Sequence, residues 1–473
     1  MKLHYIEEPL LEFGSGTHVC PRAGITSYEV YDTRLERRDK IMIGAVGTGS
    51  CLAKLRQWLE RCAQPIPGRP RNNKVELRPA FCGFNTMSGY KAELVVRDAL
   101  SRTLNNSDIR RLLKIDKWQD RVREAVELFY GHIEFLARYR VVDVIVCVIP
   151  DELYSFMFKK TAPSLEETLE EEDEQESFEH NFRRALKARA MHLGCPLQLT
   201  RELSLDSNVK SQQDDATKAW NYCTALYYKA NKTVPWKMIT DVNRPMVCYA
   251  GIGFYRSRDR KTLQTSLAQI FDELGNGVIL RGGPVQMDKD DRVPHLSSEQ
   301  AYTLLTRALV EYKRALNTAP GRLVLHKSSN YTDEELDGFR EATDDMQVQT
   351  TDFVTVSDSS VRLLRDGAYP PFRGMHVELD RESHILYTRG FVPYYRTYTG
   401  KYIPQPLEVR IVEADESPDI ICREILALTK MNWNNTQFDQ KYPITIGCAR
   451  RVGEILKYLD EGKEPQTSYS YYM

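Results

Sequence analysis

The stretch that most constrains the fold is VVDVIVCVIP, residues 141–150, which is apolar at almost every position and ends at a proline. Strands of a parallel sheet are covered on both faces and are apolar throughout, whereas strands that face solvent on one side alternate apolar with polar residues. Helices are predicted before it, over most of 91–138, and after it, over 178–193 and 214–230, with a short strand at 195–199 between the last two. This alternation predicts an α/β fold built on a buried parallel sheet.

The pattern changes after residue 245, where most of the predicted strands lie. Two helices are predicted among these strands, over 260–275 and 297–317, and two more near the end, over 418–430 and 447–459. A sheet of several strands backed by helices is compatible with a ribonuclease-H-like fold. The strands are predicted in PMVCYAGIGFYR (245–256), NGVILRGG (276–283), GRLVLHKSS (321–329), HILYTRGF (384–391) and PLEVRIVEA (406–414).

The segment VPWKM, residues 234–238, marks the boundary between the two patterns. Ahead of the strand, glycine-rich turn and helix at 41–63, short apolar and aromatic clusters predict short strands or an extended arm. The sequence therefore predicts an N-terminal extended segment over 1–40, a first domain over 41–235 and a second over 236–473. A chain of this length is too long for one ordinary core, which agrees with such a division.

Composition places the chain among soluble globular proteins, with 42% hydrophobic and 28% charged residues. No stretch is long and apolar enough for a membrane span and the N-terminus does not resemble a signal peptide, so a cytoplasmic location is predicted. The ten cysteines form no CxxC pair or zinc-like cluster, which favours buried reduced thiols. The 65 basic and 66 acidic residues nearly cancel, but the acidic stretch 166–176 leaves the remainder modestly basic.

Four polar residues of the first half form a candidate phosphate site. Arg183 and Lys187 are four apart on one predicted helix face, Gln198 follows the next turn, and Lys229 lies near the end of the following helix. Lysine supplies a point charge and arginine a two-pronged donor, which suits a terminal phosphate. The alternative is that these residues form a solvated helix face. The glycine-rich turn at 44–49 matches neither GxGxxG nor GxxxxGK[ST], which argues against a nucleotide site there.

The second half lacks the carboxylates that a nuclease with a ribonuclease-H-like fold requires. Two-metal hydrolysis needs carboxylates that converge on ions about 4 Å apart. At the middle of the first strand, the end of the strand before the loop, and the start of the last helix, the sequence has Gly253, Ser328 and Arg450. These positions predict an inactive site. A rearranged metal site is the alternative, but the nearby acids fit helix capping and surface charge better; they are Asp259, Asp333, Glu334 and Glu335.

Taken together, seven segments of the sequence resemble the short prokaryotic Argonautes, which consist of a MID and a PIWI domain. The resemblance covers essentially the whole chain and rests on the ordered set rather than on any one segment. It implies an α/β fold with a Rossmann-like MID domain over 41–235, followed by a ribonuclease-H-like PIWI domain over 236–473. The segments are VVDVIVCVIPDEL (141–153), the phosphate-site helix with CPLQ (195–198), YYKANKTVPWKM (227–238), and the stretches 250–283, 325–339, 386–411 and 428–456.

The resemblance also implies a ligand for the phosphate site. In this family the MID pocket binds the 5′ phosphate of a guide through an aromatic or basic residue, a lysine one turn on, a glutamine and a later lysine. These positions fall on Arg183, Lys187, Gln198 and Lys229. In related proteins the terminal carboxylate reaches this pocket through a divalent ion, so the resemblance implies Mg²⁺ there and a contact from Met473.

The three replaced positions of the second half coincide with the PIWI carboxylates of slicing Argonautes. The resemblance therefore implies a domain that holds a guide and target duplex but does not hydrolyse it, so this chain is not expected to be an enzyme. Contacts to backbone phosphates require only positive charge and hydrogen-bond donors. Arg256, Arg258, His326 and Lys327 are predicted to make such contacts.

Short Argonautes of this kind are typically bound to a second protein, in which an APAZ domain is joined to an effector. The resemblance implies an effector that depletes NAD, sirtuin-like in the first place and TIR in the second. The implied function is a guide-dependent sensor of a prokaryotic immune system: a small guide RNA pairs with invading single-stranded DNA, and the partner then causes abortive infection. The alternatives are a guide-directed endonuclease with a non-standard metal site, and a nucleic-acid-binding scaffold that uses no guide.

Overall fold

The computed structural model describes most of the chain. The acidic stretch 166–176, Arg258 and Asp259 lie outside the described residues, so the predictions for them stay open. The residues that are not described are 35–36, 70–73, 158–176, 208–212, 240–242, 258–261, 272–277, 288–292, 367–369, 401 and 461–462.

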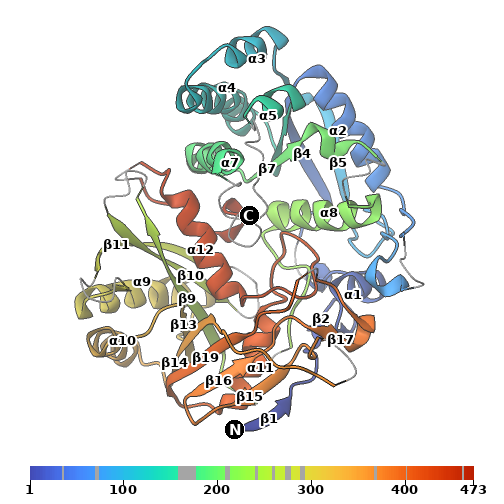
Figure 1. Cartoon of the computed structure of the whole chain (residues 1–473). Helices are drawn as coiled ribbons and strands as arrows, with labels where there is room; N and C mark the ends of the chain where they lie inside the picture. The colour runs from blue at the N-terminus through green and yellow to red at the C-terminus, as the bar shows by residue number, and fades with distance from the viewer. Residues whose placement is uncertain are drawn as a thin grey trace.

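A four-stranded parallel sheet forms the centre of the first half, in the upper part of Figure 1. Its strand order is β5-β4-β6-β7, with β4 at Lys40–Gly47, β5 at Glu93–Thr103, β6 at Val144–Ile149 and β7 at Leu197–Arg201. All six residues of β6 are buried, as its apolar sequence predicts. Helices α2 (Gly49–Cys62) and α8 (Asp215–Asn231) share a core with one face of the sheet, and α4 (Trp118–Tyr139) and α7 (Ser177–Ala190) share a core with the other.

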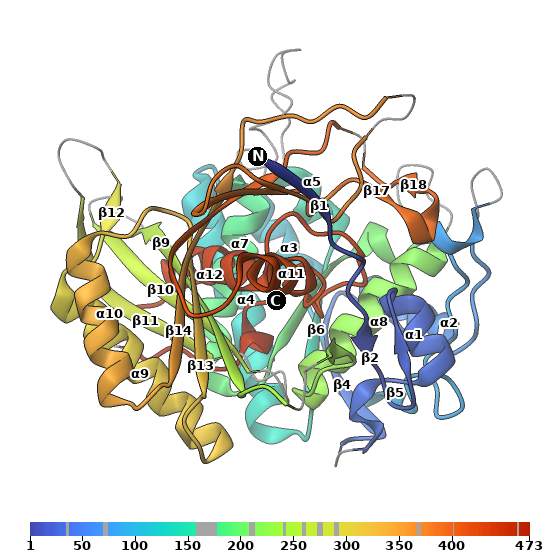
Figure 2. The same ribbon diagram turned by 90° about the horizontal axis from the view of Figure 1, so that it is seen from below.

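A ten-stranded mixed sheet forms the second half, and β13 lies parallel between β9 and β14. Helices α9 (Ser298–Leu316) and α10 (Asp333–Asp345) cover one face, and α11 (Pro418–Leu428) and α12 (Ile444–Leu456) cover the other (Figure 2). The strands in spatial order are β1 (Lys2–Tyr5), β15 (Met375–Glu378), β16 (Ser383–Leu386), β19 (Leu407–Ala414), β14 (Thr350–Asp358), β13 (Arg322–Lys327), β9 (Val247–Arg256), β10 (Leu263–Phe271), β11 (Val278–Met287) and β12 (Pro294–His295).

Smaller elements connect the two halves. The strands β2 (Leu11–Glu12), β3 (Thr17–His18) and β8 (Lys237–Met238) form a three-stranded sheet near the predicted boundary. The last residues of the sequence return to the middle of the molecule, between α8 and α12 (Figure 1). The remaining elements are α1 (Pro21–Tyr28), α3 (Asn106–Leu113), α5 (Asp151–Met157), β17 (Phe391–Val392), β18 (Thr397–Tyr398) and the short 3₁₀ turns at Tyr31–Arg34, Val75–Leu77, Met191–Leu193, Glu202–Leu205, Pro393–Tyr395 and Tyr469–Tyr471.

Three predictions of secondary structure are wrong. Residues 93–103 and 263–271, both predicted as helix, form the strands β5 and β10, and 21–28 of the predicted extended segment form the helix α1. β5 is a half-exposed edge strand, whose mixed polarity imitates an amphipathic helix. β10 is paired on both sides, with β9 and with β11, so main-chain pairing within the sheet outweighs its helix-like spacing.

Two other expectations are confirmed. All ten cysteines are free thiols, and all except Cys82 are buried. Glu335, one of the acids that the sequence assigns to helix capping, forms with Thr332 a reciprocal Thr-x-x-Glu capping box at the start of α10. No helix in the described ranges combines the length and the apolar character that crossing a membrane requires.

Candidate functional site

The four residues predicted to bind phosphate come together where α7, β7 and α8 meet. Alternation along β7 directs Leu197 and Leu199 into one core and leaves Gln198 to face α8. Lys229 lies in the last turn of α8, is 1% exposed, and donates to Gln198 Oε1 at 2.5 Å. The positive charges of Lys187 and Arg183 act on Lys229, which places all four side chains in one cluster.

The end of the sequence contributes to the same cluster. Lys187 Nζ donates to the main-chain oxygen of Met473. The turn at Tyr469–Tyr471 is buried, and the Tyr471 hydroxyl donates to the Gly194 carbonyl at 2.7 Å, just beyond α7. The position of Met473, which the resemblance implied as a contact, is therefore at this site.

Burial dominates the electrostatics of the cluster. Burial, together with the positive charges of the nearby Arg183, Arg451 and Arg184, lowers the pKa of Lys187 to about 7. Burial likewise holds the pKa of Lys229 well below its usual range. Within the described part of the chain neither lysine pairs with an aspartate or a glutamate: Lys229 donates to an amide oxygen and Lys187 to an oxygen of Met473. Such a site can bind a dianion.

Sequence reasoning missed two members of this cluster. Arg451 comes from α12, in the other half of the molecule, and no spacing rule connects it to α7. Arg184 directly follows Arg183 in α7 and also pairs with Glu454 at 2.5 Å. The contribution of α12 means that the cluster is built at the junction of the two halves.

The Mg²⁺ ion that the resemblance implies would use oxygen ligands, with carboxylates among them. The oxygens described at the cluster are Gln198 Oε1 and the main-chain oxygen of Met473, and each accepts a hydrogen bond from a lysine. The magnesium site stays a prediction. Gln198 also lines a cavity of about 230 Å³ with Asn221 and Tyr222, so space for a ligand adjoins the cluster.

The replaced nuclease positions lie on the α12 side of the ten-stranded sheet. Lys327 pairs with Ile252 in the register of β13 and β9, so Ser328 and Gly253 follow as neighbours. A Cβ atom at Gly253 would lie 3.1 Å from Ala449, so α12 packs directly on this position. Arg450 is exposed, and its guanidinium carbon lies 4.3 Å from the centre of the Tyr442 ring. In the described part of the chain, no group of three His, Cys, Asp or Glu side chains is placed to hold a metal ion.

The predicted backbone contacts of His326 and Lys327 are wrong. Both side chains are fully buried: His326 bonds Thr445 Oγ1 at 2.8 Å, and Lys327 Nζ donates to both carboxylate oxygens of Glu335 at 2.7 and 2.6 Å. Strand alternation sends His326 towards α12 and Lys327 towards α10, so neither presents a donor at the surface. Arg256 is exposed and remains available for such a contact.

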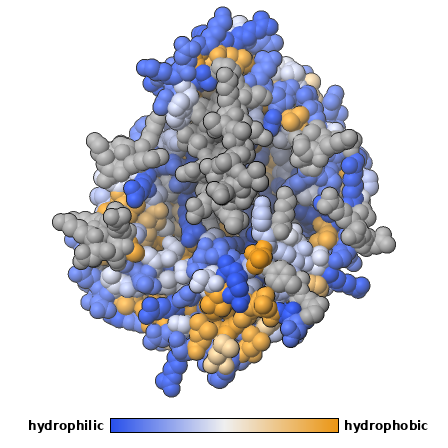
Figure 3. Space-filling model, in the orientation of Figure 1, coloured by the Kyte–Doolittle hydropathy of each residue, from blue (hydrophilic) through white to orange (hydrophobic). Residues whose placement is uncertain are grey.

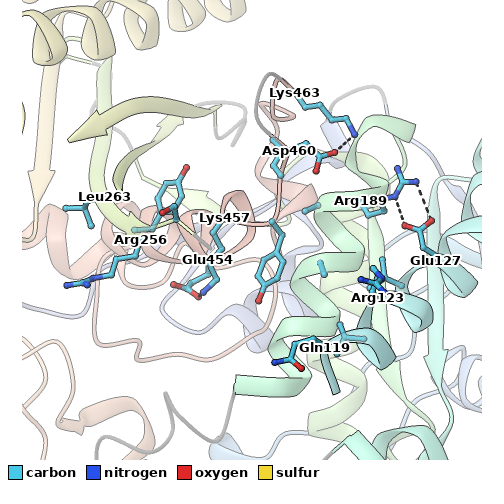
Figure 4. A pocket seen from close by; sticks show the side chains of 18 of the residues that line it. Gln119, Arg123, Glu127, Arg189, Arg256, Leu263, Glu454, Lys457, Asp460 and Lys463 are labelled. Carbon is cyan, nitrogen blue, oxygen red and sulfur yellow. Dashed lines mark hydrogen bonds and ion pairs between the residues drawn. The ribbon is translucent and has the colours of Figure 1, made fainter. Parts of the chain in front are cut away.

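A cleft of about 960 Å³ opens between the two halves, beside α4, α7 and α12 (Figure 4). Arg256 lines it, as do four basic residues that sequence reasoning missed because they come from separate segments. Arg189 pairs with Glu127 and Lys463 with Asp460, so the positive charge of the cleft is partly neutralised. The four are Arg123, Arg189, Lys457 and Lys463.

Comparison with known proteins defines the class of fold. Clostridium butyricum Argonaute bound to a guide DNA and a 19-mer target DNA matches 99% of this chain with a TM-score of 0.68 and 14% identity. Drosophila Piwi matches with a TM-score of 0.63 and 13% identity, and Marinitoga piezophila Argonaute in complex with a 5′ OH guide RNA with 0.59 and 11%, each over 100% of this chain. The chain therefore has an Argonaute-like PIWI fold.

The match covers 54% of the Clostridium butyricum chain, 56% of the Drosophila chain and 59% of the Marinitoga piezophila chain. This chain thus spans just over half the length of the structures it resembles. No family model matches the sequence, and no curated protein matches it.

Proposed function

We propose that this chain binds a nucleic-acid guide by its 5′ phosphate, through Arg183, Lys187, Gln198 and Lys229. The observation that carries the proposal is the buried Lys229, which donates to a neutral amide oxygen, with the part-buried Lys187 beside it. In the described part of the chain neither lysine pairs with an aspartate or a glutamate. A buried cation is costly unless an anion accompanies it, and a terminal phosphate brings up to two negative charges. Proteins of the same fold are described with a guide DNA and with a 5′ OH guide RNA; the cations here favour a phosphorylated end.

In this proposal the bound guide is a small RNA, and it pairs with single-stranded invading DNA that the chain does not cut. The absence of carboxylates at positions 253, 328 and 450 supports binding without cleavage. Pairing is signalled to a cytoplasmic partner protein with an APAZ domain and a sirtuin-like or TIR effector, which depletes NAD and ends the infection.

The test is the affinity of the purified chain for one guide RNA with a 5′ phosphate and with a 5′ hydroxyl. A charge-assisted contact in a buried site predicts a preference for the phosphate of about tenfold or more. Lys187→Ala and Lys229→Ala should remove the preference, whereas Lys313→Ala, on the exposed face of α9, should preserve it. Equal affinity of the wild-type chain for both ends would refute the proposal and favour a scaffold that uses no guide.

The rival function, a guide-directed endonuclease, has a separate readout. Cutting of a paired target by the isolated chain in Mg²⁺ or Mn²⁺ would establish it. The donors would then have to come from acids other than those at the three replaced positions, and loss of cutting on substitution of one such acid would locate them.

A further inference from the structure

The edge of the ten-stranded sheet exposes an apolar face. Helix α11 covers one side of β1, β15 and β16, and alternation places Leu3 and Tyr5 on the other side. Across the strands, Leu3 pairs with Val377 and Tyr5 with Met375. Leu3 is 61% exposed and Tyr5 46%, and Figure 3 shows a hydrophobic patch over this part of the molecule.

The side chains that cover this face do not reach β1, its outermost strand. The partly buried Leu363 packs against Val377 and Ile385, which are buried. Beyond them Tyr5 touches the ring of Phe372, with the ring centres 5.8 Å apart, and the apolar surface continues outward. Contiguous apolar surface of this kind marks a site of interaction more often than isolated exposed residues do.

The same strand is the open edge of the sheet. Among the strands that the structure describes, β1 stands at the end of the sheet and pairs with β15 alone. Its other side therefore offers main-chain donors and acceptors, which is a template for a further strand. An apolar face and an open edge on one strand provide both the specificity and the affinity of strand addition.

We propose that this surface, made by β1, β15 and Phe372, binds an extended strand of a second polypeptide in which apolar residues alternate with acidic ones. The apolar residues would lie beside Leu3 and Tyr5. The acidic residues would lie beside Lys2 and His4, whose present partner is Glu378. The inference rests on the proposed function in assuming that a partner protein exists. It uses none of the residues of the phosphate cluster.

Charge argues for a different polypeptide rather than a second copy. If two β1 strands paired with their apolar faces aligned, the Lys2 side chains of the two copies would lie on one face, and like charges opposite each other destabilise a pair of strands.

The test uses the full chain and a fluorescein-labelled peptide of alternating glutamate and valine, with a lysine and valine peptide as its control. Fluorescence anisotropy should give an affinity for the acidic peptide about tenfold or more above that for the basic one. Leu3→Asp combined with Tyr5→Asp should reduce binding about tenfold, because both side chains are lost from the contact and a like charge is introduced. Val141→Asp, at a more exposed apolar site in the other half, should leave it unchanged.

Sedimentation of the same samples distinguishes the outcomes. Binding that ignores the β1 substitutions, or the absence of binding, would overturn the proposal. A wild-type dimer that becomes a monomer with Leu3→Asp would also overturn it, because the occupant would then be a second copy. Guide affinity measured in the β1 variants reports the phosphate cluster separately, so failure of one proposal does not imply failure of the other.

Discussion

Lys229 in the first half and Lys327 in the second are buried to almost the same degree, 1% and 0% exposed, but their surroundings differ. Lys327 donates to both oxygens of Glu335, and Glu335 also accepts from the Leu296 and Thr332 amides. Lys229 donates to a neutral amide oxygen and lies near other cations. Burial lowers the pKa of both lysines, but only for Lys327 does a carboxylate oppose that effect. A neutralised buried cation stabilises a fold, whereas an unneutralised one is suited to a ligand.

The strongest test of this contrast is to remove each ammonium group. Lys327→Met should lower the free energy of unfolding by about 3–5 kcal/mol, because it leaves the Glu335 carboxylate buried without its cation. Lys229→Met removes a buried charge that has no carboxylate partner, so it should change stability by less than about 1 kcal/mol, or raise it. Urea unfolding of the two variants at pH 7 measures the difference.

A second substitution provides the control for the first. Lys327→Met combined with Glu335→Leu should recover much of the lost stability, since no charge is then left unpaired. Equal destabilisation by Lys327→Met and Lys229→Met would contradict the comparison, because it would mean that the cluster of the first half is neutralised as well.

The unneutralised cluster also predicts a pH dependence of guide binding. Lys187, with its pKa lowered to about 7, is neutral above that pH in the empty site and must take up a proton to bind a phosphate. Affinity for a 5′-phosphorylated guide should therefore fall by up to about tenfold per pH unit between about pH 7 and 9. Lys187→Arg, which stays charged, should flatten this dependence, and a 5′ hydroxyl guide serves as the control.

The empty protein should show the corresponding change in stability. The unfolded chain keeps the Lys187 proton up to about pH 10.5, whereas the folded chain loses it near 7, so the unfolded state binds more protons in between. The free energy of unfolding should therefore increase as pH rises from 7 towards 10, and Lys187→Met should remove that increase. A guide affinity that is independent of pH in the wild type would show that Lys187 does not contact the phosphate.

The sequence alone was sufficient for the parts of this comparison that depend on local patterns. The apolar stretch ending at Pro150 predicts β6, the Thr332 box predicts the start of α10, and the spacing of Arg183 and Lys187 predicts a shared helix face. Glu335 shows the limit, because the capping interpretation is correct but omits the ion pair with Lys327. That pair depends on how separate elements pack, so the spacing of residues in the sequence does not reveal it. The same holds for the approach of Arg451 and Met473 to Lys187.

The helix predictions for β5 and β10 are wrong for a related reason. Their apolar residues fall at positions that suit either structure, and the choice is made by main-chain pairing with β4, β9 and β11. The four-residue phosphate cluster could be named because the family resemblance linked residues from three elements. Residue chemistry alone favoured a solvated helix face.

The smallest expected effects test whether the second half has space for a ligand at its replaced positions. A Cβ atom at Gly251 would lie 2.4 Å from the Thr445 carbonyl oxygen, and one at Gly253 would lie 3.1 Å from Ala449, whereas at Gly447, on α12 itself, nothing lies within 4 Å. Gly251→Ala should therefore destabilise the chain by about 1–3 kcal/mol through overpacking, and Gly253→Ala by less than about 1 kcal/mol. Gly447→Ala should stabilise it by up to about 1 kcal/mol, as alanine does in a helix interior. If Gly251→Ala left stability unchanged, α12 could move away from β9 and this half, too, could open a site. A loss of stability that is larger at Gly251 than at Gly253, with a gain at Gly447, would mean that the glycines let α12 fill the space that a ligand would need.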